Sequence, residues 1–246
     1  MTITLCIDVG GTRLKAALVD DAGQLVSPAV RLKTPYPCPP ERLVERLTKL
    51  ASSVGDYDRV SVGFPGLVRA GTIHHVPSLS RSTNGGATDP ALVAAWRDFP
   101  LQSVLKKTFG KPTRVANDAD VQGSAVVRGS GFEFVITLGT GVGTAVFQDG
   151  VLIPHIELSH AHFRRGESFD LALGNATRKR LGDLRWQKDV VRALKAFDAF
   201  LYFDHCYVGG GNASRMKGVP LPPRCTLVSN TAGITGGIYL WSSKNR

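Results

Sequence analysis

The feature that most constrains the fold is a glycine turn placed between two apolar segments. Residues 2–6 and 16–20 are largely apolar and are expected to form buried strands on either side of this turn. Glycine tolerates positive φ and lets another group approach the backbone closely, so Gly10 and Gly11 allow several N–H groups to face an anion. Taken alone, the motif is also compatible with a plain hairpin that has a Gly-Gly turn.

A second segment of the same kind lies in the other half of the chain. Strands are expected at residues 134–138 and 144–147, and the turn between them contains Gly139, Thr140 and Gly141. Strand, glycine turn and strand therefore occur once in each half. This pairing favours two phosphate-binding turns, one in each of two domains.

The rest of the chain alternates between expected strands and helices, which is typical of an α/β protein. Further strands are predicted at residues 24–33, 59–64, 113–116, 151–153, 205–208 and 225–228, and helices at residues 41–54, 101–109 and 187–203. A closing helix is expected after a cap at Ser229 or Asn230. The strand at residues 59–64 runs into Pro65-Gly66, which opens a loop at the sheet edge where open α/β folds bind ligands.

Composition is that of a cytoplasmic globular protein. No apolar run approaches the roughly 20 residues that a membrane helix requires, and the N-terminus lacks the pattern of a secretory signal. Cys6, Cys38, Cys206 and Cys225 are scattered and form no C-x-x-C pair. We therefore expect reduced thiols, with neither a zinc site nor a disulfide framework.

The formal net charge of +10, from 30 basic and 20 acidic residues, favours an anionic partner or substrate. A basic cluster between Arg178 and Lys188 is interpreted as a solvated helix face in preference to a polyanion site. No zinc finger, RNP-like aromatic motif or helix-turn-helix pattern indicates a nucleic acid partner.

Five motifs follow one another in a characteristic order. They are Asp8-x-Gly10-Gly11-Thr12-x-x-Lys15, Gly63-Phe64-Pro65-Gly66, Asn117-Asp118, Thr137-x-Gly139-Thr140-Gly141-x-Gly143 and Gly209-Gly210-Gly211-Asn212. In this order they resemble the ROK family of sugar kinases, within the actin-like ATPase and hexokinase superfamily. The correspondence runs from about residue 3 to residue 241 and is nearest to the polyphosphate glucokinases of that family.

The resemblance implies an α/β protein with the two-domain actin-like ATPase (ribonuclease H-like) fold and an interdomain cleft. The domains would be residues 1–118 and residues 119–246, each with one phosphate turn, and the final helix could pack back on the first domain. The family also implies a homodimer, a hexose substrate, Mg²⁺, and polyphosphate or ATP as the phosphoryl donor. Neither a nucleic acid nor a membrane is an expected partner.

The resemblance further implies a role for each matching residue. Asp118 would be the catalytic base that takes the proton of a sugar hydroxyl, although an Asp in this place can also simply cap a helix. The sugar-binding residues would be Gly66, Asn117, Glu157, His160 and Glu167. The phosphate-binding residues would be Gly10, Gly11, Thr12, Lys15, Thr137, Gly139, Thr140, Gly141, Gly143, Gly210, Gly211 and Asn212, with Asp8 near Mg²⁺.

The chain departs from the family pattern in three places. Ser78 stands where family members tend to have a sugar-binding Asn, and it belongs to the polar, glycine-rich residues 77–90, which we expect to be the most flexible loop. Residues 162–165 are His-Phe-Arg-Arg where many relatives are apolar. The Cys-x-Cys-Gly-x-x-Gly-Cys zinc motif of many ROK kinases is missing, so no zinc is expected.

Three functions are weighed. The favoured one is a phosphotransferase that moves a terminal phosphoryl group from polyphosphate or ATP to the 6-hydroxyl of glucose or a similar hexose; the basic balance favours polyphosphate. A catalytically silent sugar or polyphosphate binder is the alternative that Ser78 suggests. A sugar-responsive regulator is less favoured, because only seven residues precede Asp8, too few for a winged helix-turn-helix.

Overall fold

The computed structural model describes residues 1–229 and 232–242, which divide into two compact units. Unit 1 holds Met1–Ala125 and the C-terminal segment that starts at Gly233, and unit 2 holds Val126–Ala232. The division falls after helix α4 (Asp118–Ser124), later than the boundary expected at residue 118, because α4 packs on strands of unit 1. Asn230, expected as one of two possible caps of the closing helix, lies outside the described residues.

A five-stranded mixed sheet in the order β3-β2-β1-β4-β7 forms the centre of unit 1. Its antiparallel part consists of β1 (Thr4–Val9), β2 (Arg13–Val19) and β3 (Val30–Lys33). β4 (Arg59–Phe64) and β7 (Thr113–Asn117) continue the sheet and run parallel to β1. The carboxyl ends of β1, β4 and β7 therefore meet at one edge, where Gly10, Pro65 and Asp118 follow them.

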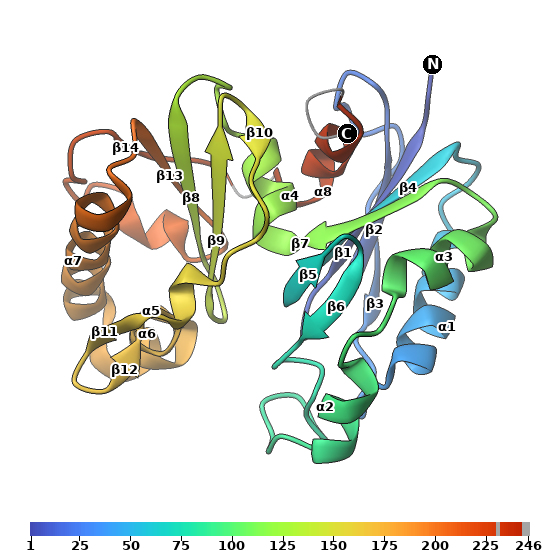
Figure 1. Cartoon of the computed structure of the whole chain (residues 1–246), viewed down its shortest axis with the longest axis horizontal. Coiled ribbons are helices and arrows are strands. Elements are labelled where there is room, and N and C mark those ends of the chain that lie inside the picture. Colours follow the sequence, from blue (N-terminus) through green and yellow to red (C-terminus); the bar gives the residue numbers. More distant parts are fainter. Residues whose placement is uncertain (230–231, 243–246) are drawn as a thin grey trace. The chain divides into compact units, whose positions relative to one another are not determined.

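Helices pack on both faces of this sheet: α1 (Pro40–Ala51) and α3 (Leu101–Phe109) on one face, and the C-terminal helical segment that contains Ile238 on the other (Figure 1). α1 and α3 contact each other and the sheet, and they share the main core with Leu5, Ile7 and Val9 of β1. Cys6, which points to the other face of the alternating strand, packs instead with Ile238 in a smaller core. Both faces of the sheet are thus covered.

The C-terminal segment is fixed on β4. Ile238 belongs to η3 (Gly236–Trp241), a 3-10 helix that follows α8 (Ala232–Thr235). Trp241 Nε1 donates to Ser61 Oγ at 2.8 Å, and Ser61 donates to the carbonyl of Gly237 at 2.7 Å. The guanidinium of Arg59 lies 5.2 Å from the centre of the Trp241 ring.

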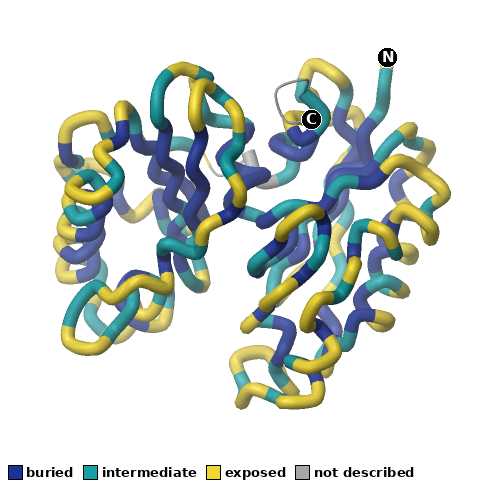
Figure 2. The backbone as a smooth tube through the Cα atoms, in the orientation of Figure 1, coloured by how far each residue is buried: buried dark blue, intermediate teal, exposed yellow. Residues whose placement is uncertain are grey.

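Unit 2 has a sheet of the same topology, in the order β10-β9-β8-β13-β14. β8 (Phe132–Leu138), β9 (Val142–Gln148) and β10 (Val151–Leu152) are antiparallel, and β13 (His205–Gly209) and β14 (Cys225–Leu227) run parallel to β8. The amphipathic helix α7 (Asp183–Leu201) buries its apolar side in a core shared with this sheet. In both units the central strands are buried and the outer turns exposed (Figure 2).

The remaining elements are short. Unit 1 also has the hairpin β5 (Leu67–Arg69) and β6 (Thr72–His75) and the helix α2 (Pro90–Trp96). Unit 2 also has η1 (Leu158–His160), β11 (His162–Arg164), β12 (Glu167–Ser168), α5 (Phe169–Leu173), α6 (Asn175–Leu181) and η2 (Ala213–Met216). In the described part of the chain, no helix combines the length and the apolar character needed to cross a membrane.

The strand predicted at residues 24–33 is too long, because only Val30–Lys33 forms a strand. The Asp20 carboxylate accepts hydrogen bonds from the N–H groups of Ala22 and Gln24, which holds a turn before the strand. Pro28 then has no N–H to donate to a ladder. The β5–β6 hairpin was not anticipated, since its strands are too short to show an apolar period.

Candidate functional site

The first glycine turn, between β1 and β2, has its carbonyl groups bonded on one side. Thr34 Oγ1 donates to the Gly10 carbonyl at 2.6 Å, and the Thr34 N–H donates to the Thr12 carbonyl at 3.2 Å. The Tyr36 hydroxyl donates to the Gly11 carbonyl at 2.7 Å. Burial raises the pKa of Tyr36, so this hydroxyl keeps its proton and remains a donor at neutral pH. Each carbonyl of the turn therefore has a fixed partner.

The bonded carbonyls determine where the N–H groups point. In a trans peptide the N–H lies opposite the preceding carbonyl, so the N–H groups of Gly11 and Thr12 face away from Thr34 and Tyr36. Neither N–H donates to a protein group within residues 1–229 and 232–242. Neighbouring N–H groups that point the same way form a concave anion site. The exposed Thr12 adds a hydroxyl to these donors.

Asp8 and Lys15 are paired across the two strands that lead into and out of this turn. Lys15 Nζ lies 2.7 Å from Asp8 Oδ2, and both side chains are partly exposed. No group of three or more His, Cys, Asp or Glu residues is placed to hold a metal ion in the described ranges. Mg²⁺ is commonly bound by only one or two carboxylates together with phosphate oxygens and water, so a carboxylate beside a phosphate turn suits this ion.

The second glycine turn, between β8 and β9, is built on the same principle with different partners. The Asn175 N–H donates to the carbonyls of Gly139 and Thr140 at 3.2 and 3.1 Å, and Asn212 Nδ2 donates to Gly139 at 3.0 Å. The N–H groups of Thr140 and Gly141 therefore point away from Asn175. Neither donates to a protein acceptor among the described residues, so this turn offers N–H donors in the same way as the first turn.

The glycine segment that follows β13 is brought against this second turn. The Asn212 N–H donates to the Leu138 carbonyl at 2.8 Å. Gly210 has a φ of 87°, and a Cβ there would lie 2.5 Å from Leu138 backbone atoms, so only glycine fits. Thr137 and Gly143 are paired across the strands that flank the turn, and Gly211 is exposed beside it. The predicted phosphate-binding residues of unit 2 thus lie together.

An arginine holds the residue that bonds the second turn. Arg178 donates through Nε and Nη2 to Asn175 Oδ1, each at 3.1 Å, and through Nη1 to Asp183 at 2.6 Å. Its side chain is only 14% exposed. Arg178 is therefore bonded within the protein, to Asn175 and Asp183, whereas its sequence pattern favoured a solvated helix face.

Asn117 and Asp118 lie at the junction of β7 and α4 in unit 1. Asn117 caps the helix by accepting from the Ala119 N–H at 2.7 Å, and its Nδ2 donates to the Gly66 carbonyl at 2.9 Å. Asp118 is the first residue of α4 and is half-buried, with Oδ1 accepting from the Ala119 N–H at 2.9 Å. The structure therefore brings Asn117, Asp118 and Gly66 together, with Asn117 fixed by two hydrogen bonds.

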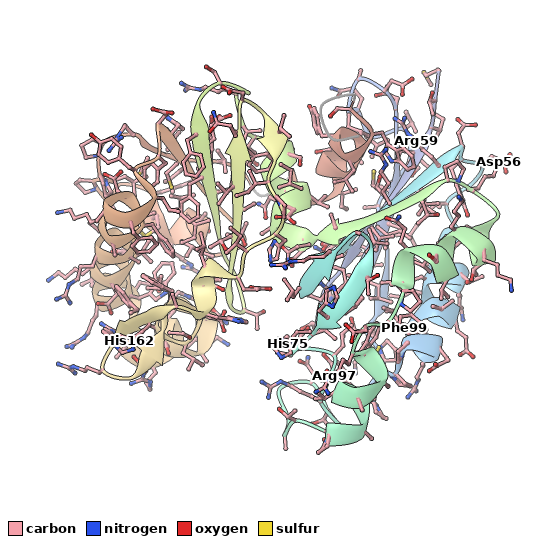
Figure 3. The ribbon with its side chains drawn as sticks, in the orientation of Figure 1. Asp56, Arg59, His75, Arg97, Phe99 and His162 are labelled. Atoms are coloured by element: carbon pink, nitrogen blue, oxygen red, sulfur yellow. The ribbon has the colours of Figure 1, made fainter. Side chains whose placement is uncertain are left out.

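The position of Gly66 depends on close packing against β6. A Cβ at residue 66 would lie 2.2 Å from the carbonyl oxygen of His75, which is backbone and cannot move aside. His75 is the last residue of β6 (Figure 3). The loop after β4 is thus pressed onto the β5–β6 hairpin, and this holds the Gly66 carbonyl where Asn117 reaches it.

Glu157 and His160, the predicted sugar-binding pair of unit 2, lie at the two ends of η1. Glu157 Oε2 is 3.9 Å from His160 Nε2, and Glu157 Oε1 is 3.3 Å from Nε2 of His155. His155 is buried, whereas Glu157 is half-buried and His160 exposed. This places a carboxylate and an imidazole side by side at the surface, and such a pair can accept from and donate to sugar hydroxyls.

Glu167 does not join this pair in any contact of the described residues. It lies on β12 between two arginines, with Oε2 at 3.7 Å from Arg164 Nε and Oε1 at 3.7 Å from Arg180 Nη2. Arg164 is held in turn by the buried carboxylate of Asp189 at 2.5 Å. His162, one of the residues that depart from the family pattern, is exposed on β11 (Figure 3).

Several residues of this site carried no recognisable signal in the sequence. Thr34 and Tyr36 lie in a Pro-rich segment, and Asn175 follows a short helix, so neither position suggested contact with a glycine turn. No sequence pattern indicated the contact of Asp170, which accepts from the Val142 N–H at 2.7 Å, either. Such contacts join segments that are distant along the chain, and local sequence patterns do not report them.

The ROK family model matches residues 4–156 of the chain. The polyphosphate glucokinase of Mycobacterium tuberculosis is 30% identical over 245 residues, which cover 94% of this chain and 88% of the relative. The chain belongs to the ROK family.

Solved structures give the same result for the fold. The inorganic polyphosphate/ATP-glucomannokinase from Arthrobacter sp. strain KM has a TM-score of 0.81 at 27% identity, with 97% of each chain covered. A ROK family glucokinase from Streptomyces griseus, in complex with glucose and AMPPNP, has a TM-score of 0.75 at 18% identity, covering 97% of this chain and 98% of that one. The predicted α/β class and actin-like ATPase fold are confirmed.

Proposed function

We propose that this protein transfers a terminal phosphoryl group from polyphosphate or ATP to the 6-hydroxyl of glucose or a similar hexose. The chain is a hexose kinase, since it belongs to the ROK family and its relatives over nearly the whole length are glucokinases and a glucomannokinase. The donor, the hydroxyl and the catalytic base are the finer part of the proposal. The observation that carries it is the pair of turns whose N–H groups are turned outward by bonded carbonyls.

The two turns are proposed to bind the phosphates of the donor. The N–H groups of Gly11, Thr12, Thr140 and Gly141 would donate to phosphate oxygens, and hydrogen bonds to a charged acceptor are stronger than those between neutral groups. Lys15 would add a positive charge next to the first turn. Asp8 would hold Mg²⁺, which would neutralise part of the charge on the donor.

Asp118 is proposed as the general base. As the new bond forms between the hexose oxygen and phosphorus, the hydroxyl proton passes to the Asp118 carboxylate, and the bond from phosphorus to the donor oxygen breaks. Asn117, held by Gly66 and the helix N-terminus, fixes the backbone that carries Asp118. Asn117, Glu157, His160 and Glu167 are proposed to contact sugar hydroxyls. Two of them already have protein partners: Asn117 is bonded to Gly66 and Ala119, and Glu167 lies between two arginines.

A coupled assay for glucose 6-phosphate, run with polyphosphate and with ATP, tests this function. We expect turnover with at least one donor, and Asp118→Asn should lower kcat by about 10²- to 10⁴-fold, the usual contribution of a general base. The Asn side chain can still accept from the Ala119 N–H, so the variant should melt like the wild type. Absence of turnover with both donors on glucose, mannose and N-acetylmannosamine would reject the proposal.

A catalytically silent binder is the second candidate, and Ser78 is the observation that favours it. Ser78 stands where the family resemblance implies a sugar-binding Asn, and its Oγ is buried without a hydrogen-bond partner in the described structure. Calorimetry that detects glucose binding while neither donor supports turnover would favour this candidate. A homodimer and a cytoplasmic location also stay predictions, and light scattering of the purified protein checks the first.

A further inference from the structure

Residues 80–89 form a small hairpin, although residues 77–90 were expected to be the most flexible loop. An antiparallel bridge joins Arg81 and Thr88, and the Asp89 N–H donates to the Ser80 carbonyl at 2.9 Å. Arg81 Nη1 crosses the hairpin and donates to the Gly86 carbonyl at 2.5 Å. Both arms are thus connected by backbone and side-chain hydrogen bonds.

The tip of this hairpin is a tight turn that presents Asn84. The Gly86 N–H donates to the Thr83 carbonyl at 3.0 Å, which closes a four-residue β-turn. Gly85, the third residue of this turn, has a φ of 75°, as a type II turn requires. Asn84 therefore occupies the second position, where its side chain is exposed and does not take part in closing the turn.

The tip of the hairpin contacts the first glycine turn directly, and Ser78, just before the hairpin, is linked to the same turn through Tyr36. Asn84 Nδ2 donates to Thr12 Oγ1 at 3.3 Å. Nearer the base, the Tyr36 hydroxyl that donates to Gly11 also lies 3.1 Å from the Ser78 carbonyl. The tip of the hairpin is therefore held beside Thr12, and the chain before the hairpin is held near Gly11.

The contact between Asn84 and Thr12 has a chemical consequence for an anion at this turn. A hydroxyl that accepts one hydrogen bond still has its own proton to donate, so Asn84 leaves the Thr12 hydroxyl as a donor. The Asn84 amide has a second N–H, and it lies beside the same hydroxyl. The side chains of Thr12 and Asn84 thus each keep a donor, next to the backbone N–H groups of Gly11 and Thr12.

We propose that Asn84 is a further phosphate-binding residue, which binds the phosphoryl donor together with Thr12 at the first glycine turn. The ligand class is a phosphoanhydride chain, as in inorganic polyphosphate or the triphosphate of a nucleotide. The inference rests on the proposed function for the identity of this ligand. It assigns Asn84, at the tip of the hairpin, to donor binding, whereas the family resemblance at Ser78 concerns the sugar.

Calorimetric titration with inorganic tripolyphosphate tests the inference without any need for turnover. Asn84→Ala should weaken binding by about threefold to tenfold, the range of one hydrogen bond to a charged acceptor that is partly exposed to water. Asn84→Asp should weaken it more, because it adds a negative charge beside the phosphate. Ser82→Asp is the matched control: it puts the same charge into the same hairpin, at an exposed residue whose N–H donates to the Ala87 carbonyl and whose side chain makes no hydrogen bond to Thr12 among the described residues.

The kinetic counterpart separates donor from sugar. For Asn84→Asp we expect a higher KM for the donor and an unchanged KM for glucose. The inference is overturned if Asn84→Asp and Ser82→Asp bind tripolyphosphate equally well, if the KM for glucose changes instead, or if the wild type does not bind tripolyphosphate. A different result would reject the proposed function: the wild type would bind tripolyphosphate but form no hexose phosphate.

Discussion

Replacing Asn117 by Ala should destabilise unit 1 strongly, because this buried side chain makes two hydrogen bonds that join separate elements. Loss of the helix cap to Ala119 costs about 1 kcal/mol. Loss of the donor to the buried Gly66 carbonyl leaves that oxygen unsatisfied, which costs about 1–3 kcal/mol. The sum is about 2–4 kcal/mol, or roughly 5–15 °C in Tm for a protein of this size.

Chemical denaturation of the Asn117→Ala variant measures this loss, and Asp89→Ala provides a matched control in the same unit. Asp89 caps α2 by accepting from the Ala91 N–H at 2.9 Å, and within residues 1–229 and 232–242 its side chain makes no second hydrogen bond like the one to Gly66. The control should therefore lose only about 1 kcal/mol. If both variants lose the same free energy of unfolding, the bond between Asn117 and Gly66 does not contribute, and a role for Asn117 in positioning Asp118 is refuted.

Three further outcomes are expected. Tyr36→Phe should weaken tripolyphosphate binding severalfold while leaving the KM for glucose unchanged, because the Gly11 carbonyl loses its donor; equal effects on both substrates would contradict this. Gly66→Ala should lower Tm by several degrees, since its Cβ would clash with the His75 carbonyl, and an unchanged melting curve would refute that packing. Iodoacetamide should modify Cys225 before Cys6: a hydrogen bond from Cys206 lowers the pKa of Cys225 from its ordinary value, whereas burial raises the pKa of Cys6 to about 12. As the pH is raised, the rate of alkylation of Cys225 should increase at a lower pH than the rate for an ordinary thiol. Mass spectrometry of the labelled peptides checks both sites.

The two sheets were predictable because their signals are local. Strands were expected at residues 2–6, 16–20, 134–138 and 144–147, and β1, β2, β8 and β9 confirm them. β1, β2 and β9 extend further toward their turns, whereas β8 begins earlier than predicted, at Phe132. Apolar runs bounded by glycine are among the strongest local patterns in a sequence. The positions of the glycine turns followed from them.

Other features were not predictable because they depend on particular hydrogen-bond partners, which composition does not identify. The polar, glycine-rich composition of residues 77–90 indicated a loop and gave no sign of the bridge between Arg81 and Thr88 or of the contact with Thr12. Arg178 looked like a surface charge because nothing in the sequence places Asn175 and Asp183 around it. In each case hydrogen-bond partners decide the structure, and composition does not identify them.

The glycine motifs themselves do not explain why the turns suit an anion. A Gly-Gly turn in an ordinary hairpin exposes carbonyl oxygens as well as N–H groups, and exposed oxygens would repel a phosphate. In unit 1 the carbonyls are bonded by Thr34 and Tyr36, and in unit 2 by Asn175 and Asn212, which have no sequence similarity to the first pair. Different donors thus produce the same peptide orientation at both turns. The shared property is therefore the outward direction of the N–H groups, and the glycines permit it while the donors impose it.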